Sequence, residues 1–406
     1  MISHSSELGK MSILEKKTKD EPVLTGLLAR DAAEQRAAGY ADTLREILQQ
    51  PSSWRDTARL LQHDTTRSSL AQVLAATTGP LVLTGSGSSM YIGECLAPVL
   101  QEGLGREARA IPAGTLLTHW RSVLPPQPGL LVSLARSGDS PESGGVVDCL
   151  LAEAPAWRHL VITCNADGRL ATAYRDDPRV SVLVLDERTN DRSLVMTSSF
   201  TNLLLAGSGL PSPADAPVVA ERAAVAVQAM IDRHADALAA LAQRDIHSAV
   251  YLGSGGALGA AQEGALKMLE MTGGKVITMA ETFLGLRHGP MSSVHDTTLV
   301  VALLSPDPRV RAYEHDLLRE LSRKQLGLAK LIVGEGIPDD LVAPGDVVVD
   351  LPLGGAGEVP ALLAHVVAGQ LLAFFRCLHL DGTPDAPAQG VLTRVVEGFV
   401  LHGAGT

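Results

Sequence analysis

The segment Leu81-Val-Leu-Thr-Gly-Ser-Gly-Ser-Ser89 has the pattern of a short apolar strand that runs into a glycine- and serine-rich turn. The same pattern returns in Val250-Tyr-Leu-Gly-Ser-Gly-Gly256, and Gly85 and Gly253 are separated by 168 residues. Self-similarity at a fixed offset indicates an internal repeat. The sequence therefore predicts two similar structural units.

Three further pairs of apolar segments keep nearly the same offset. They are Leu130–Leu134 with Thr298–Ala302, Leu160–Thr163 with Leu331–Gly334, and Val180–Leu185 with Val347–Pro352. Segments with helical periodicity lie between them, and continuous Val, Ile and Leu strands that alternate with helices are typical of parallel sheets covered on both faces. We therefore expect an α/β chain of two domains, each with four strands in the same order.

The expected domain boundaries follow from breaks in this pattern. Pro211-Ser-Pro-Ala-Asp-Ala-Pro217 interrupts it before an Ala-rich helix near 218–243, and Pro51 separates two further helices at 31–50 and 53–63. The three expected parts are a tail with helices at 1–69, a first domain at 70–215, and a linker helix, second domain and C-terminal tail at 216–406. Residues 1–20 are polar and lack the features of a secretory signal.

Composition narrows the class of partner. The 34 Lys and Arg against 45 Asp and Glu give a net charge of −11 with no basic cluster, which argues against nucleic acid and anionic membranes as partners. The most apolar stretch, 360–375, is interrupted by His365 and Gln370, and it is shorter than the roughly 18 apolar residues of a spanning helix. We expect no transmembrane segment.

The four cysteines stand alone. No C-x-x-C spacing occurs among Cys95, Cys149, Cys164 and Cys377, so neither a disulfide framework nor a thiolate zinc site is expected. Buried free thiols and a cytoplasmic location fit this usage.

Two hydroxyl-rich turns are candidates for binding an anion. Ser86, Gly87, Ser88 and Ser89 lie between a strand and a helix N-terminus, where free N–H groups and the helix dipole favour a phosphate, although a plain helix cap would have the same composition. The next strand ends in a similar turn that contains Ser137 and Ser140. Ligands bind at the carboxyl ends of parallel strands, so we expect these turns to bind substrate together with Thr197 and Ser198, which follow the fourth strand.

The second half carries a charged stripe on an otherwise apolar helix. Glu263, Lys267 and Glu270 share one face of a helix expected at 257–272. Buried in a cleft, such groups suit proton transfer near neutral pH, whereas on a surface they would form ordinary salt bridges.

The loop after this helix contains two more candidate site residues. His288 lies in Leu286-Arg-His-Gly-Pro290, where proline and glycine define a turn, and Glu281 precedes it. As alternatives, His288 could have a purely structural role or could bind a metal together with His295. The metal-binding H-E-x-x-H spacing is absent, so we expect no metal and no cofactor.

Taken together, these motifs resemble tandem sugar isomerase (SIS) domains, a phosphosugar-binding module with a flavodoxin-like αβα sandwich. The resemblance covers about residues 40–400. It rests on Arg45–Pro51, Thr84–Ser89, Arg136–Ser140, Thr197–Thr201, Gln262–Glu270 and His288–Pro290.

The resemblance implies roles for individual residues. Ser86, Ser88, Ser137 and Ser140 would hold the substrate phosphate, and Glu270 would move a proton between sugar C1 and C2. His288, supplied by a neighbouring subunit, would assist ring opening, which implies at least a homodimer. Glu263 and Lys267 would line the same pocket.

Departures from the family pattern narrow the choice. No glutaminase domain precedes the tandem, and the lysine that forms a Schiff base in the tail of glucosamine-6-phosphate synthase is missing, with Leu392-Thr-Arg394 in its place. The chain is most similar to catabolic galactosamine-6-phosphate deaminase/isomerases, often labelled tagatose-6-phosphate ketose/aldose isomerases. The implied reaction is deamination of an amino-sugar 6-phosphate, with plain aldose–ketose isomerisation or a non-catalytic phosphosugar sensor as alternatives.

Overall fold

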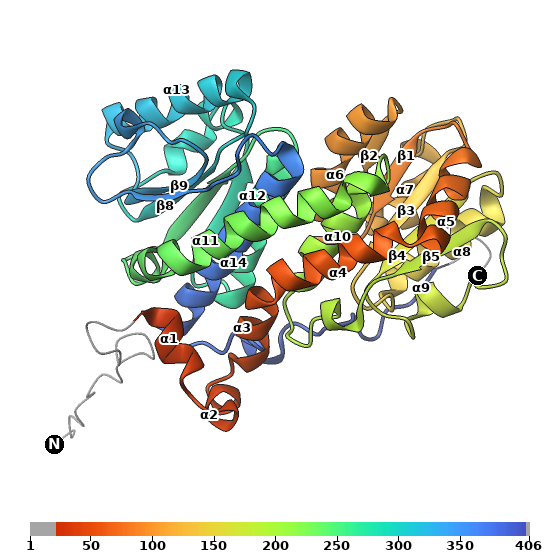
Figure 1. Cartoon of the computed structure of the whole chain (residues 1–406), viewed down its shortest axis with the longest axis horizontal. Coiled ribbons are helices and arrows are strands. Elements are labelled where there is room, and N and C mark those ends of the chain that lie inside the picture. The colour runs from red at the N-terminus through yellow and green to blue at the C-terminus, as the bar shows by residue number, and fades with distance from the viewer. Residues whose placement is uncertain (1–21, 403–406) are drawn as a thin grey trace.

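The computed structural model describes residues 22–402, so the expected tail at 1–20 lies outside it. Two parallel five-stranded sheets lie side by side with helices between and around them (Figure 1). One sheet falls within residues 70–215 and the other within 216–406. The expectation of a two-part α/β chain is confirmed.

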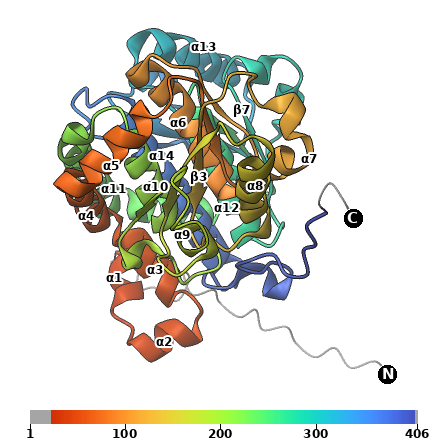
Figure 2. The same cartoon turned by 90° about the vertical axis from the view of Figure 1, so that its right-hand side faces the viewer.

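The first sheet has the strand order β2-β1-β3-β4-β5, which is the flavodoxin-like order. Its strands are β1 (Leu81–Thr84), β2 (Ala108–Ala110), β3 (Leu130–Ala135), β4 (Arg158–Thr163) and β5 (Val180–Val184). Its helices are α5 (Asp64–Ala75), α6 (Ser88–Leu104), α7 (Ala113–Val123), α8 (Pro141–Glu153), α9 (Arg169–Thr172) and α10 (Ser198–Ser208). Figure 2 shows α7 and α8 on the opposite side of this sheet from α10.

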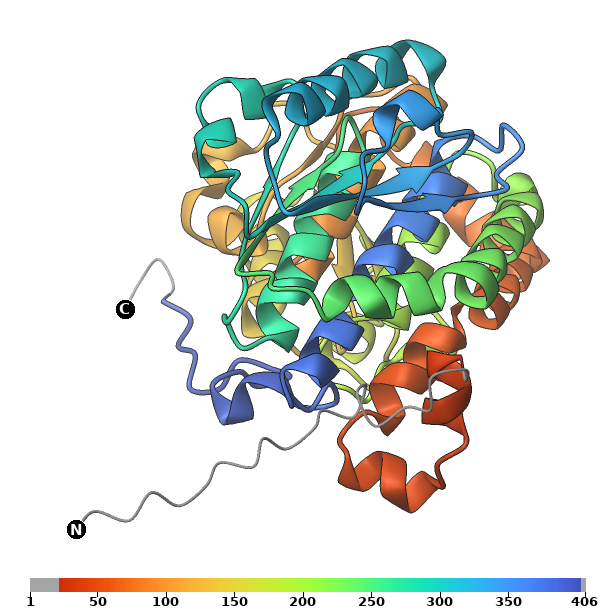
Figure 3. The same ribbon diagram turned by 90° about the vertical axis from the view of Figure 1, so that its left-hand side faces the viewer.

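The second sheet repeats that order as β7-β6-β8-β9-β10. Its strands are β6 (Ser248–Leu252), β7 (Ile277–Glu281), β8 (Thr298–Leu303), β9 (Ala329–Gly334) and β10 (Val347–Asp350). Its helices are α12 (Ala257–Met271), α13 (Pro308–Lys324) and α14 (Glu358–His379). Helix α13 covers the outer face of this sheet (Figure 3).

The expectation of four strands per domain was wrong, because each sheet has a fifth strand at its edge. These strands are β2 and β7, and each contacts only β1 or β6, respectively. Their sequences, Ala-Arg-Ala and Ile-Thr-Met-Ala-Glu, lack the continuous apolar pattern that marks the other eight strands.

The N-terminal helices also differ from the expectation. The segment 31–50 is not one helix: α2 (Ala32–Ala37) and α3 (Ala41–Leu48) are separated at Gly39, whose φ of 70° is a left-handed conformation that ends a helix. Pro51 lies inside the first turn of α4 (Gln50–Gln62), a position where its missing N–H costs nothing. Helix α1 (Val23–Leu28) precedes them, and α11 (Ala216–Ala242) is the expected linker helix.

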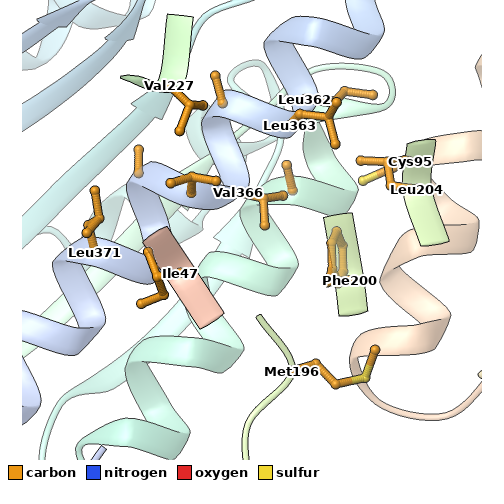
Figure 4. Packing of buried hydrophobic residues seen from close by; sticks show 14 of the residues in the cluster. Ile47, Cys95, Met196, Phe200, Leu204, Val227, Leu362, Leu363, Val366 and Leu371 are labelled. Atoms are coloured by element: carbon orange, nitrogen blue, oxygen red, sulfur yellow. The ribbon is translucent and has the colours of Figure 1, made fainter. Parts of the chain in front are cut away.

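The core lies between the two sheets. Helices α4, α6, α10, α11, α12 and α14 pack against one another there and join both domains in one buried apolar cluster. Figure 4 shows side chains of this cluster, among them Val366 and Leu371 of α14, Val227 of α11 and Phe200 of α10. Helix α14 is long and apolar enough to cross a membrane, but its apolar window is entirely buried, as expected for a central core helix.

The cysteines are free in the structure. Cys95, Cys164 and Cys377 are buried as expected, whereas Cys149 is only half-buried.

Candidate functional site

The turn after β1 has the geometry of an anion cradle. Gly87 has a φ of 56°, which lets the chain turn sharply into α6, and the N–H groups of Ser89 and Met90 donate to the carbonyls of Ser86 and Gly87. No side chain caps the N-terminus of α6 among the described residues. Ser88 is buried and Ser86 is half-buried. The first N–H groups of α6 therefore have no carboxylate acceptor among the described residues, and the positive end of the helix dipole remains able to attract an anion.

The turn after β3 lies beside it, because β1 and β3 are adjacent parallel strands. Ser140 is the N-cap of α8, which starts at Pro141 and has no side-chain cap, and Gly138 has a φ of 72°. The buried Arg136 donates to the carbonyls of Ser193 and Leu194 at 3.2 and 2.8 Å. Two uncapped helix N-termini thus meet at the carboxyl edge of the first sheet, at the point where the strand order reverses.

The third hydroxyl cluster, Thr197 to Ser199, is held by hydrogen bonds to Asp191 of the same chain. The carboxylate of buried Asp191 accepts hydrogen bonds from the hydroxyls of both Ser198 and Ser199 and from the N–H of Thr197. The fold therefore already uses the Ser198 hydroxyl that we expected to bind substrate. Thr197 has a buried hydroxyl with no partner among the described residues, so it is the member of this turn that remains able to bind a ligand.

The acid/base groups project from the C-terminal part of α12. Lys267 is buried, its ammonium forms an ion pair with Glu270, and it lies 3.5 Å from the carboxylate of Glu263. Glu263 is fully buried, whereas the Glu270 side chain is 22% exposed and so remains accessible to a ligand. The surface alternative for this stripe is wrong.

Burial controls the protonation of these groups. It raises the pKa of Glu263 to about 7, with Lys267 and the Ser88 hydroxyl opposing the rise and Glu270 adding to it. Burial alone would lower the pKa of Lys267, but the carboxylates of Glu263 and Glu270 outweigh it and the pKa is raised. At neutral pH the lysine is charged and is shared between its two neighbours.

The two domains meet at this site. Helix α6 packs against α12, so Ser88 at the start of α6 faces Glu263. Tyr91, one turn further along α6, has a pKa raised by burial and by Glu263 and Glu270. Glu270 lies two helical turns beyond Glu263, about 10 Å along α12. The phosphate-type turns of one domain thus lie next to the acid/base groups of the other.

Glu281 and His288 lie elsewhere in the same chain. Glu281 ends β7 opposite Leu252, and its backbone carbonyl accepts from Gly253 just before α12 begins, whereas Glu270 lies near the other end of α12, roughly 20 Å away along the axis. His288 is exposed and its side chain makes no hydrogen bond or ion pair with described residues. Within one chain, the structure therefore places Glu281 and Glu270 at opposite ends of α12, and His288 makes no hydrogen bond or ion pair with Glu270.

The C-terminal segment crosses the site. Asp385 accepts from the N–H of Thr43 at the start of α3, and Ala388 lies against Gly273, three residues after Glu270. Arg394 then donates to Asn190 near the phosphate-type turns, and Leu401 packs near Gly145 of α8. Figures 2 and 3 both show this segment passing below α12.

Three residues of this site, Arg136, Asp191 and Tyr91, were not predicted from the sequence. Arg136 adjoins the serine-rich turn and Tyr91 lies one helical turn from Ser88, so spacing alone points to both. Asp191 had no such signal, because its contact with the start of α10 depends on how the loop after β5 folds back. Among residues 22–402, no group of three His, Cys, Asp or Glu residues could hold a metal ion.

No protein-family model matches the sequence. A Streptomyces coelicolor relative that carries the name AgaS is 39% identical and covers 89% of this chain and 95% of its own. D-galactosamine-6-phosphate deaminase AgaS from Escherichia coli is 34% identical with the same coverage. The crystal structure of tagatose-6-phosphate ketose/aldose isomerase from Escherichia coli superposes with a TM-score of 0.80 and 32% identity, covering 90% of this chain and 97% of that one.

Proposed function

Since the chain belongs to the AgaS family of tandem-SIS phosphosugar enzymes, we propose that it deaminates galactosamine 6-phosphate to tagatose 6-phosphate and ammonia. The observation that carries the proposal is the juxtaposition of two uncapped helix N-termini in one domain with the buried Lys267 and the accessible Glu270 of the other. The first feature suits a phosphate and the second suits proton transfer at the opposite end of a hexose.

The phosphate end is formed by the first domain. Ser86, Ser88 and Ser89 of one turn and Ser137 and Ser140 of the other surround the dianion, and Gly87 lets the backbone approach it closely. Thr197 offers its unpartnered hydroxyl to the sugar. This arrangement leaves C1 and C2 near α12.

The chemistry starts when the ring opens and the C1 aldehyde makes the C2 proton acidic. His288 of a neighbouring subunit takes the proton of the C1 hydroxyl and passes it to the ring oxygen, and Glu281, seven residues before His288, comes to the site with it. The Glu270 carboxylate removes the C2 proton and delivers it to C1 of the resulting enolamine. Lys267 holds Glu270 in place. Water then adds to the C2 imine, and ammonia leaves as the ketone forms.

The same groups support a second reaction. When C2 carries a hydroxyl, the proton transfer gives a ketose without loss of ammonia, so isomerisation of tagatose 6-phosphate is the alternative function. Both reactions fit an enzyme that works in the cytoplasm as a homodimer or a larger oligomer and needs no cofactor.

The test is to measure ammonia and ketose 6-phosphate from galactosamine 6-phosphate, glucosamine 6-phosphate and their N-acetyl forms. We expect equimolar ammonia and tagatose 6-phosphate from galactosamine 6-phosphate. If the folded enzyme releases no ammonia but interconverts tagatose 6-phosphate with its aldose, the isomerase is the function. If it binds sugar phosphates and turns over none of them, the enzyme proposal fails.

A further inference from the structure

The second domain repeats the phosphate-type turns of the first. Gly255 has a φ of 57°, against 56° at Gly87, and the N–H groups of Ala257 and Leu258 donate to the carbonyls of Ser254 and Gly255. These hydrogen bonds match those of the first turn residue for residue at the offset of the internal repeat. The second turn is repeated as well, since the Asp307 N–H donates to the Ser305 hydroxyl as that of Asp139 does to Ser137.

A cavity of about 480 Å³ opens at these repeated turns. Its lining includes Ser254, Gly255, Ser305, Asp307 and Glu358. By shape and by backbone geometry, the second domain therefore keeps room for a ligand where the first domain would bind phosphate.

The hydrogen-bond donors of this cavity are already occupied by carboxylates of the chain. Glu358, at the start of α14, accepts from the Gly256 N–H at 3.1 Å, at the N-terminus of α12. Asp307 caps α13 by accepting from the Arg309 N–H at 2.7 Å. Buried Glu314 accepts from the Ser305 N–H at 2.8 Å. None of α6, α8 and α12 is capped by the side chain of its own N-cap residue, but among the described residues no carboxylate accepts from a first-turn N–H group of α6 or α8. Asp139, which stands at the repeat position of Asp307, accepts from the N–H of Arg169 instead of capping α8.

This difference gives the turns of the two domains opposite electrostatic preferences. A free helix N-terminus attracts an anion, whereas a carboxylate that already accepts from its N–H groups satisfies them and repels a second negative charge. The second-domain lining contains no Lys or Arg side chain to offset that repulsion.

We infer that Glu358 and Asp307 take the place of the substrate phosphate in the second domain, so that each chain binds one sugar phosphate, in the first domain. The inference rests on the proposed function only for the identity of the first-domain ligand. It assigns Glu358 and Asp307 as the residues that exclude sugar phosphates from the repeated site.

The first experiment measures binding stoichiometry by titration calorimetry. The probes are inorganic phosphate and a hexitol 6-phosphate, which has no carbonyl and cannot react. The wild-type protein should bind one equivalent per chain. Ser86→Ala/Ser137→Ala should weaken binding at least tenfold, whereas the matched Ser254→Ala/Ser305→Ala should leave it unchanged. Two equivalents per wild-type chain, or a loss of binding in the second pair, would overturn the inference.

The second experiment removes the carboxylates. Asp307→Ser/Glu358→Ala should gain a second phosphate equivalent while turnover stays at the wild-type level. Asp316→Ser/Glu320→Ala on α13 changes the net charge equally and should gain none. An Asp307→Ser/Glu358→Ala protein that keeps turnover but still binds one equivalent would contradict the role of these residues. If this variant does not fold, the inference is still tested by the wild-type stoichiometry and by the two serine-pair variants. The calorimetric stoichiometry does not depend on turnover. A protein that binds one equivalent but releases no ammonia would therefore contradict the deaminase proposal and leave this inference intact.

Discussion

The ammonium of Lys267 lies 3.5 Å from the carboxylate of Glu263, and both side chains are buried at the boundary between the two domains. Removing two charges from water is costly, so a pair in this position is retained only where its surroundings compensate. Here Lys267 also pairs with the more exposed Glu270, which links the buried charges to the part of the site that substrate can reach.

Glu270→Gln should abolish turnover and leave substrate binding intact. Loss of a catalytic base costs roughly 10²–10⁴-fold in rate, while the amide keeps the shape and hydrogen-bonding capacity of the side chain. Ammonia release and hexitol 6-phosphate affinity are the two readouts. Glu320→Gln is the matched control, because Glu320 is 19% exposed and is also paired with a lysine, but lies on α13. Wild-type rates in Glu270→Gln would exclude Glu270 as the base.

Mixing two inactive subunits should restore activity if His288 is supplied by a neighbour. In a random mixture of Glu270→Gln and His288→Ala chains, half of the dimers are mixed and each has one site with both native residues, so roughly a quarter of the wild-type sites recover. If both residues act in the same chain, no site in the mixture is intact. Co-expression with two affinity tags and double purification isolates the mixed dimers, in which one site of two is native, so the ammonia assay should recover about half of the wild-type activity if the residue is shared and none if it is not.

Lys267→Met should destabilise the protein by about 3–5 kcal/mol, because it leaves a buried carboxylate without its counter-charge. Adding Glu263→Gln should recover most of that loss, since the amide carries no charge. Urea denaturation of the two single variants and the double variant gives the coupling energy. Lys324→Met is the control: its ion pair with Glu320 is on the surface and is expected to contribute less than about 1 kcal/mol. A Lys267→Met loss no larger than this control would show that the buried pair is not needed for folding.

The stability of the wild-type protein relative to Glu263→Gln should fall as pH rises from about 4.5 to about 7. Burial raises the pKa of Glu263 from 4.5 to about 7, so the folded state binds a proton more tightly than the unfolded state in this window. The protonated Glu263 makes its full contribution to the free energy of unfolding below pH 4.5, and this contribution is lost as pH rises through the folded-state pKa. At 1.36 kcal/mol per pKa unit, the loss is up to about 3 kcal/mol.

The comparison with Glu263→Gln is needed because other groups titrate in the same range. Burial lowers the pKa of His159 to about 4 and of His365 to about 3, so both histidines make stability rise with pH up to about 6.5. Their effect is the same in both proteins and cancels in the difference. Urea midpoints measured at pH 5, 6, 7 and 8 give this difference, and a flat profile would mean that Glu263 keeps an ordinary pKa.

Local pattern was sufficient for the strands in the centre of each sheet and for the residues that follow them. The strands β1, β3, β8 and β9 are buried along their whole length, so each carries a continuous apolar run that can be read without its neighbours. The strands β5 and β10 are only partly buried, but they carry a similar run of valines. The strands β2 and β7, Ala-Arg-Ala and Ile-Thr-Met-Ala-Glu, have no such run, so the pattern did not predict them.

The duplicated α/β architecture, the serine-rich turns and the charged face of α12 can all be predicted from the amino-acid sequence, because each depends on contacts within a few residues or on a repeat visible along the chain. Which of these groups act together depends on the packing of the folded chain. The burial of Lys267, the capture of Ser198 by Asp191, and the occupation of the second-domain turns by Glu358 all depend on residues distant in sequence. Their energies arise from desolvation and from hydrogen bonds that exist only after the two domains have packed.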